Sequence, residues 1–389
     1  MCLLCGALIE IGKAQGPPDF KALYDAHQWF ELRDALAGDS GSALYRGAVA
    51  VAFNQTADAE AALKPIIKCE SDYEADEASE WLSYMYVRSG RYRQAAAAMD
   101  DSSVTENMLG RLPDQALRKF ERCTVSCRKY QRRLFIPGSI AGKALEFFID
   151  SDANFSFMSE SEARSLGLPI HESNDHVYGA TGNRAKFRVA VADELTVGSI
   201  ELKNVTFLVL PDSEEVFRRV PLDAQASVGI PVLLAFRTLE IDWQAHRVEI
   251  GFPSQAENKA SASICFDGVN PVAVMDFQRQ HLPVVLDTGA AETEIWPLFA
   301  KRFAELVNSG KASFEVKKAV GGEVQFSEKV LPELKLRLGG FDALLRPAHV
   351  LLDQTTPDSE WYYGRLGLDV LQLGRKVTID FEALKLTIE

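Results

Sequence analysis

The chain has 389 residues, 47% of them hydrophobic and 25% charged, and a formal net charge of -13 at pH 7. This length favours two or three domains with a large buried core, and the composition is that of an ordinary globular protein. The negative charge argues against a nucleic-acid-binding surface, because such surfaces need clustered Lys and Arg. No apolar run reaches the roughly 18 residues that a membrane-spanning helix requires.

The N-terminus and the cysteines leave the cellular compartment open. Residues 1–11 are apolar but have no basic start, so they fit a signal-peptide remnant and a first helix equally well. The cysteines lack the paired spacing of a zinc site, and we expect buried thiols. Cys123 and Cys127 would lie on adjacent turns of a helix, which also allows a bridge between them. The six cysteines are Cys2, Cys5, Cys69, Cys123, Cys127 and Cys265.

From about Pro18 to Cys127 the sequence predicts helices, because apolar residues recur three and four positions apart and strand-like alternation is missing. The segment that starts at Ala48 aligns with the one that starts at Trp81, at an offset of 33 residues. The second copy resembles a tetratricopeptide repeat, whose period is about 34 residues. An unspecific helical bundle is the alternative. Residues 1–127 are expected to form a helical domain that docks a partner, gates the protein or simply packs.

After the basic stretch 128–133 the pattern changes to short apolar strands separated by Pro and Gly. One strand, 284–286, runs directly into Asp287-Thr288-Gly289-Ala290. This motif resembles the active-site loop of aspartic proteases, and the Ala is typical of the retropepsin-like branch. A second apolar strand runs into Asp150-Ser151-Asp152, where Asp152 stands in place of the expected Gly.

A long internal repeat connects these two loops. Its landmarks recur in one order and at nearly one spacing, which predicts a tandem duplication with lobes at 128–253 and 254–389. The paired landmarks are Asp150 with Asp287 at an offset of 137, and Val228-Gly229 with Leu366-Gly367 and Ile241-Asp242 with Ile379-Asp380 at an offset of 138.

The resemblance implies a multidomain α plus mainly β protein, in which the helical domain precedes two retropepsin-like lobes with a substrate cleft between them. In that family an apolar-Gly element packs against each catalytic loop, and a Gly-rich flap closes over the substrate. An ordinary hairpin turn is the simpler interpretation of each Gly cluster. The flap candidates are Tyr178, Gly179 and Gly182 in the first lobe, and Gly321 and Gly322 in the second.

The activity that the resemblance implies is that of an aspartic-type endopeptidase. Two adjacent carboxylates, here Asp150 and Asp287, share a proton, so that one activates water while the other polarises the peptide carbonyl. By the same resemblance, Ser151 and Thr288 would join the two loops through hydroxyl hydrogen bonds. Gly289 lets the backbone approach the carboxylates without a Cβ. No metal or cofactor is expected.

Asp152 leaves several alternatives open, because it adds a third carboxylate beside the pair and would raise their pKa values. The protein is then an active protease, a catalytically impaired pseudoprotease that binds peptides, or a protein that keeps the fold for a structural role. A helical domain that blocks the cleft until it is removed near Gln131 is a further alternative. A cation pocket formed by Asp150, Asp152 and Asp287 is the least favoured.

The expected partners are a peptide or protein substrate and, through the helical domain, another protein. A monomer would suffice at the active site, because one chain supplies both aspartates. Bacterial relatives of this architecture often carry a signal peptide, so the resemblance favours an exported location over a cytoplasmic one.

Overall fold

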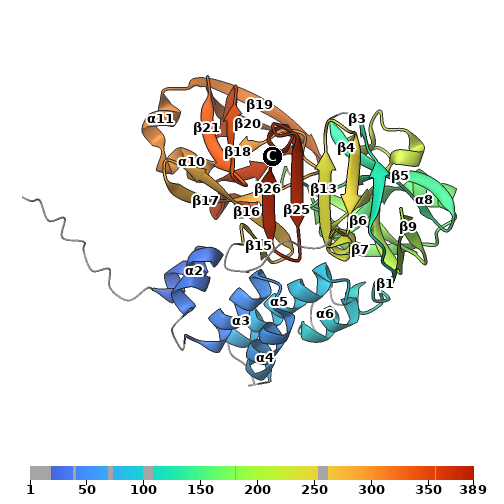
Figure 1. Cartoon of the computed structure of the whole chain (residues 1–389). Helices are drawn as coiled ribbons and strands as arrows, with labels where there is room; N and C mark the ends of the chain where they lie inside the picture. Colours follow the sequence, from blue (N-terminus) through green and yellow to red (C-terminus); the bar gives the residue numbers. More distant parts are fainter. Residues whose placement is uncertain are drawn as a thin grey trace, which may run out of the picture.

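The computed structural model describes residues 19–37, 41–68, 73–99, 108–130, 132–179, 181–252, 262–354 and 356–389. A layer of helices lies beneath two β lobes (Figure 1). The expectations for residues 1–11, Cys69 and Gln131 lie outside the described residues. No described helix is long and apolar enough to cross a membrane.

The helical layer consists of short helices in which consecutive members pack against each other. Asp19 and Ser42 cap two of them by accepting hydrogen bonds from the backbone N–H groups of Ala22 and Tyr45. The two segments aligned in the sequence each span a turn between helices, α3 to α4 and α5 to α6. The tetratricopeptide-like repeat itself stays a prediction. The helices are α1 (Phe20–Asp25), α2 (Trp29–Leu36), α3 (Ala43–Ala52), α4 (Thr56–Ile67), α5 (Tyr73–Arg88) and α6 (Tyr92–Ala98).

The prediction of helix as far as Cys127 is wrong at its end. β1 (Ala116–Lys119) and β2 (Cys123–Ser126) are strands, and each pairs with a strand more than 80 residues further along the chain. Such long-range pairing overrides local helical spacing. It also separates Cys123 and Cys127, which are free thiols and do not form the bridge that adjacent helical turns would allow.

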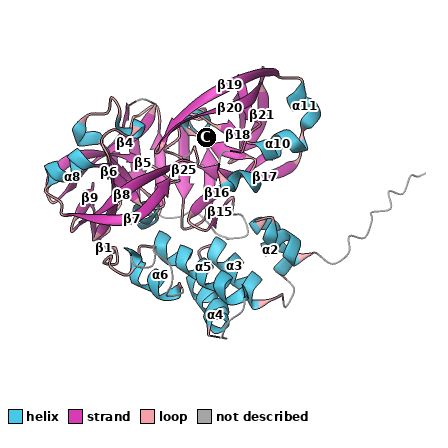
Figure 2. Cartoon of the chain, turned by 180° about the vertical axis from the view of Figure 1, so that it is seen from behind, coloured by secondary structure: helices cyan, strands magenta, loops and turns pink. Residues whose placement is uncertain are grey.

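Each lobe is built on one large curled sheet, and the two sheets have corresponding strand orders (Figure 2). In the first lobe the order from β10 is β10-β9-β4-β5-β12-β6-β11-β8-β7, and in the second it is β22-β21-β16-β17-β24-β18-β23-β20-β19. Each sheet places the strand before an aspartate loop parallel to the strand of an apolar-Gly element. These two curled sheets fit a bilobal aspartic-protease fold.

The strands of the first lobe are β3 (Arg128–Tyr130), β4 (Arg133–Ile140), β5 (Lys143–Ile149), β6 (Ser156–Ser159), β7 (Ile170–Tyr178), β8 (Arg184–Ala192), β9 (Leu195–Val197), β10 (Ile200–Lys203), β11 (Val205–Leu210) and β12 (Ala226–Val228), with helices α8 (Glu160–Leu166) and α9 (Ile230–Phe236). Those of the second are β15 (Ile264–Asp267), β16 (Asn270–Phe277), β17 (Gln280–Leu286), β18 (Glu294–Ile295), β19 (Lys311–Ala319), β20 (Gly322–Leu331), β21 (Leu334–Leu338), β22 (Phe341–Leu345), β23 (Ala348–Leu351) and β24 (Gly364–Leu366), with helices α10 (Pro297–Arg302), α11 (Ala304–Asn308) and α12 (Leu368–Leu371).

A third sheet joins the two lobes. It has the order β2-β14-β13-β25-β26, in which β13 (Thr238–Asp242) and β14 (Arg247–Ile250) follow the first lobe, and β25 (Lys376–Asp380) and β26 (Lys385–Ile388) end the second. Asp242 and Asp380 close corresponding turns, because each accepts hydrogen bonds from backbone N–H groups two and three residues later. Their contacts are structural.

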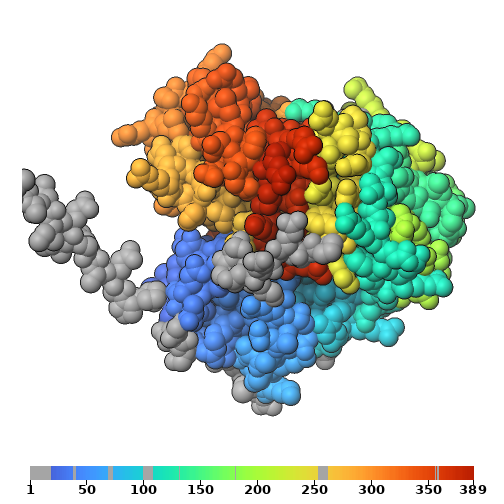
Figure 3. Space-filling view, viewed as in Figure 1, coloured from blue at the N-terminus to red at the C-terminus, as the bar shows by residue number. Residues whose placement is uncertain are grey.

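The helical layer contacts both lobes, as the space-filling view also shows (Figure 3). Arg88 of α5 is fully buried and donates a hydrogen bond of 2.6 Å to the carbonyl of Gly268 in the second lobe. Tyr92 of α6 stacks on Phe155 in the first lobe, with ring centroids 5.5 Å apart. The layer therefore braces the two lobes from one side.

Candidate active site

The two aspartate loops leave corresponding strands and are anchored in the same way. The backbone N–H of Asp150 donates to the carbonyl of Val228 at 3.1 Å, and that of Asp287 donates to the carbonyl of Leu366 at 3.0 Å. The apolar strands β5 and β17 bury their last residues, which fixes where each loop begins. The two apolar-Gly elements thus lie directly against the two loops.

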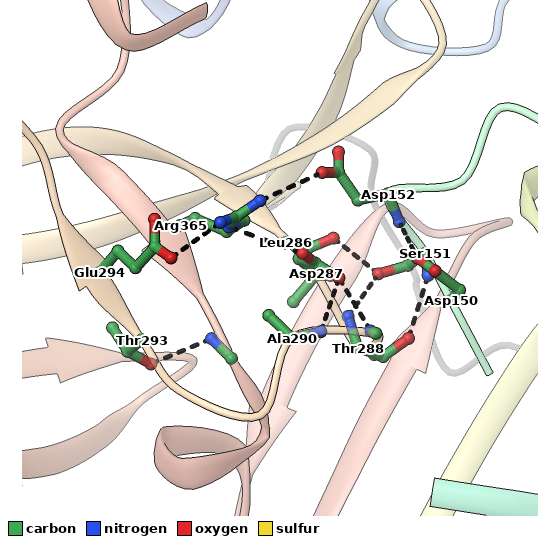
Figure 4. A network of polar contacts seen from close by, with 12 residues as sticks. Asp150, Ser151, Asp152, Leu286, Asp287, Thr288, Ala290, Thr293, Glu294 and Arg365 are labelled. Carbon is green, nitrogen blue, oxygen red and sulfur yellow. Dashed lines mark hydrogen bonds and ion pairs between the residues drawn. The ribbon is translucent and has the colours of Figure 1, made fainter. Parts of the chain in front are cut away.

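Ser151 and Thr288 connect the loops across the lobe interface (Figure 4). Each backbone N–H donates to the hydroxyl of the other residue at 3.0 Å. The Thr288 hydroxyl donates to the carbonyl of Ile149 at 3.0 Å, and the Ser151 hydroxyl donates to the carbonyl of Leu286 at 2.6 Å. Both side chains are fully buried. These bonds hold Asp150 and Asp287 in a fixed relative position.

The paired carboxyl groups lie at the floor of a cavity and titrate abnormally. The pKa of Asp150 is raised from 3.8 to about 7. Burial is the larger cause, and the negative charge of Asp287 is the second. Burial also raises the pKa of Asp287, although Arg365 and the N–H groups of Gly289 and Ala290 oppose that rise. Near neutral pH such a pair retains a proton that isolated carboxyl groups would lose.

The loops differ at the residue after the hydroxyl. A Cβ on Gly289 would lie 2.5 Å from Cγ of Asp150, so only Gly fits there. Asp152 holds the corresponding position in the first loop, where its N–H donates to Oδ1 of Asp150 at 3.2 Å. Its carboxylate lies at 4.0 Å from Arg365 and its side chain is 26% exposed. The first loop therefore accommodates the Cβ that the second would reject.

Arg365 is a site residue that the sequence reasoning missed. It belongs to β24, its side chain is 6% exposed, and its Nε lies 3.6 Å from Oδ2 of Asp287. It also donates a 2.8 Å hydrogen bond to Glu294, which pairs with Lys317 at 2.6 Å. Burial alone would raise the pKa of Glu294, but Arg365 and Lys317 lower it to about 2. The available signal was a charged residue directly before the apolar-Gly element Leu366-Gly367.

The candidate flap residues lie at or beside the tips of two hairpins that meet above the cavity. Tyr178 ends β7, Gly179 follows it, and both line the cavity; Gly182 belongs to the same hairpin tip. Gly321 lies in the turn between β19 and β20, and Gly322 begins β20. A Cβ on Gly179 would collide with the carbonyl of Val320, which shows how closely the tips approach.

The cavity has a volume of about 1080 Å³, which is large enough for several residues of a peptide. Exposed apolar side chains line its walls. Of the described residues before 128, Met108 alone lines the cavity, so the described helices do not fill it. The exposed apolar residues are Tyr178, Val316, Leu344 and Leu373.

A separate group of side chains has the composition of a metal site. Possible ligand atoms of Glu315, Glu328 and His349 lie within 4.8 Å of one another. Nδ1 of His349 already contacts Glu328 at 2.9 Å, and the ammonium of Lys317 lies 3.9 Å from Glu315. A bound cation would compete with that ammonium, so the arrangement favours ion pairs. The sequence also suggested a cation pocket at the aspartate loops. There the guanidinium of Arg365 lies between Asp152 and Asp287, in the place that a cation would take.

Comparison with known proteins gives one family match and distant structural similarities. Residues 136–230 match the family model described as "Aspartyl protease". A retropepsin-like aspartic protease from Rickettsia conorii is 14% identical, with 35% of this chain and 93% of that chain covered at a TM-score of 0.25. An aspartic proteinase from Irpex lacteus is 11% identical, with 68% and 96% covered at a TM-score of 0.38.

No curated protein matches the chain. The family match includes the altered loop of Asp150, Ser151 and Asp152, and it ends before the loop of Asp287. The similarity to the aspartyl-protease family model is therefore confined to the segment 136–230.

Proposed function

We propose that the protein is an aspartic-type endopeptidase that uses Asp150 and Asp287, one from each lobe, to hydrolyse peptide bonds. The observation that carries the proposal is the reciprocal hydrogen bonding of Ser151 and Thr288, which brings two carboxyl groups with raised pKa values to one cavity floor. Such a pair holds one proton over the range in which one member must be ionised and the other protonated.

The reaction needs no covalent intermediate. The ionised carboxylate takes a proton from water as the water oxygen attacks the carbonyl carbon of the peptide, and the protonated carboxyl group gives its proton to the carbonyl oxygen. The resulting diol then collapses: one of its hydroxyl groups gives its proton to the carboxylate that is now ionised, the C–N bond breaks, and the leaving nitrogen receives the proton of the other carboxyl group. The carboxyl groups end with the single shared proton with which they began.

The cavity fits an extended peptide as substrate. Its apolar wall residues, Tyr178 and Val316 among them, are exposed in the free protein and would become buried on binding. The two hairpin tips would cover the peptide and exclude water from the reacting bond. The helical layer contacts both lobes and is free to bind another protein on its outer side.

A peptide-binding pseudoprotease is the second candidate, and Asp152 with Arg365 favours it. A guanidinium 3.6 Å from Asp287 opposes the rise in the pKa of that carboxylate, and a weaker base activates water less effectively. In this case the cleft would bind peptides without cutting them.

Cleavage of a diverse peptide library by the full-length protein between pH 3 and 8 separates the candidates. Wild type, Asp287→Asn and Asp152→Gly are compared, with Asp342→Asn as a control that removes an exposed carboxylate from β22. The endopeptidase proposal predicts cleavage by wild type and Asp342→Asn that disappears in Asp287→Asn. Cleavage by Asp152→Gly alone would favour the pseudoprotease, and peptide binding would then be expected to persist in Asp287→Asn.

A further inference from the structure

The two lobes differ in charge at one pair of corresponding positions. In the first lobe Phe157 and Ser227 occupy neighbouring strands β6 and β12, and the N–H of Phe157 donates to the Ser227 hydroxyl at 2.9 Å. In the second lobe Glu294 and Arg365 face each other across β18 and β24. A neutral contact on one side of the cleft is thus replaced by a buried ion pair on the other.

Arg365 lies among carboxylates from three separate elements (Figure 4). Its guanidinium is 2.8 Å from Glu294 on β18, 3.6 Å from Asp287 after β17, and 4.0 Å from Asp152 after β5. Lys317 on β19 also pairs with Glu294, at 2.6 Å. Because Glu294 has this second cation beside it, Arg365 does not serve Glu294 alone. Its positive charge also acts on the aspartate loops.

The contacts of the two aspartates are unequal. Oδ1 of Asp287 accepts hydrogen bonds from the N–H groups of Gly289 and Ala290 at 2.8 and 2.9 Å, and Arg365 approaches its Oδ2. Oδ1 of Asp150 accepts from the N–H of Asp152 at 3.2 Å. The guanidinium of Arg133 on β4 lowers the pKa of Asp150, but it is half-buried and donates a hydrogen bond to the carbonyl of Val216 at 2.7 Å. Donors and positive charge thus favour the ionised form of Asp287 over that of Asp150.

We propose that Arg365 is a positioning residue that assigns the roles of the pair, keeping Asp287 ionised as the base and leaving the proton on Asp150 as the acid. The same guanidinium offsets the additional carboxylate of Asp152. The inference rests on the proposed function and explains how the chain tolerates Asp where the family motif has Gly: the added negative charge in one lobe faces an added positive charge in the other.

The test measures titration of the aspartates directly as well as catalysis. Full-length protein is labelled with ¹³C at the Asp carboxyl carbons, and the signals of Asp150 and Asp287 are assigned from Asp150→Asn and Asp287→Asn. Arg365→Gln removes the charge and keeps a donor for Glu294, which also retains Lys317. A unit charge at 3.6 Å acts strongly even when screened, so we expect the Asp287 titration to rise by about one pH unit or more. The acidic limb of the pH profile of kcat/KM should move to higher pH by a similar amount.

Three further variants show whether charge is the cause. Arg365→Lys should shift the Asp287 titration by less than half as much as Arg365→Gln. Asp152→Gly removes a negative charge near Asp287 and should shift the Asp287 titration to lower pH. This variant provides the test if Arg365→Gln does not fold. Arg122→Leu removes a guanidinium that is 58% exposed and outside the cavity lining, and should leave the titration in place.

An unchanged Asp287 titration in folded Arg365→Gln, or an upward shift in Asp152→Gly, would overturn the role of Arg365 even if the protein cleaves peptides. Absence of cleavage at every pH would refute the proposed function instead. The carboxyl titrations would then still decide whether Arg365 distinguishes the two aspartates.

Discussion

Ser151 and Thr288 each donate a backbone N–H to the hydroxyl of the other at 3.0 Å, so the two lobes share one rigid floor beneath the cavity. The hydroxyl of each also donates to a carbonyl of the opposite strand. Because no water reaches these buried groups, the geometry of the aspartate pair depends on both hydroxyls.

Thr288→Val tests this dependence with a side chain of nearly the same volume. The change leaves the N–H of Ser151 and the carbonyl of Ile149 without their partners, so we expect a loss of about 1–3 kcal/mol of unfolding free energy. Urea unfolding and peptide cleavage are measured together. Thr288→Ser keeps the hydroxyl and is the control; equal stability of the Val and Ser variants would contradict the importance of the hydroxyl.

Asp150→Asn tests the raised pKa of Asp150 through stability. The folded-state pKa is about 7 and the ordinary value is 3.8, so the protonated form stabilises the fold below pH 4. That stabilisation is lost as the pH rises towards and through 7, by at most about 4 kcal/mol. Asn has no charge to bury, so the variant should gain stability over wild type at pH 8 and lose that gain near pH 4. Thermal melts of both proteins and of Asp342→Asn across this range provide the measurement, and a difference independent of pH would refute the assignment.

Gly289→Ala tests the asymmetry between the loops. The new Cβ would lie 2.5 Å from Cγ of Asp150, which forces the two loops apart. We expect cleavage to fall about a hundredfold, because small displacements of reacting groups cost that much. Asp152→Ala places the same methyl group at the corresponding site of the other loop and should keep far more activity. Similar losses in both variants would mean that the loops are equally tolerant.

Glu214→Ala tests how the second hairpin tip is held over the cleft. The Glu214 carboxylate accepts a 2.9 Å hydrogen bond from the N–H of Gly321, which ties the tip of one lobe to the other lobe. Loss of this hydrogen bond should weaken substrate binding by about 1 kcal/mol, which raises KM roughly fivefold and changes kcat little. Glu215→Ala removes the adjacent carboxylate, which pairs with Arg218, and serves as the control. An effect of the same size in the control would exclude a specific role for Glu214.

The aspartate loops could be predicted from the sequence because their signal is local. Asp287, Thr288 and Gly289 follow an apolar strand without interruption, and the offset of 137 then points to Asp150. Each loop strand lies beside the strand of its apolar-Gly element, as the family resemblance implied.

Arg365 and the strands β1 and β2 could not be predicted in the same way. Arg365 matters because it faces Asp152, more than 200 residues earlier, and this proximity appears only after both lobes have folded. β1 and β2 form because β10 and β14 offer free edges, and their own residues carry little strand pattern. Contacts between distant segments, rather than local propensity, decide these features.

The central claim is that Asp150 and Asp287 act as one catalytic unit. The most direct measurement is kcat/KM of wild type, Asp150→Asn, Asp287→Asn and the double variant on one cleaved peptide at its optimal pH. If the pair acts as a unit, each single variant should lose at least about a thousandfold and the double variant hardly more. Substantial cleavage by either single variant, or losses that multiply in the double variant, would contradict the claim.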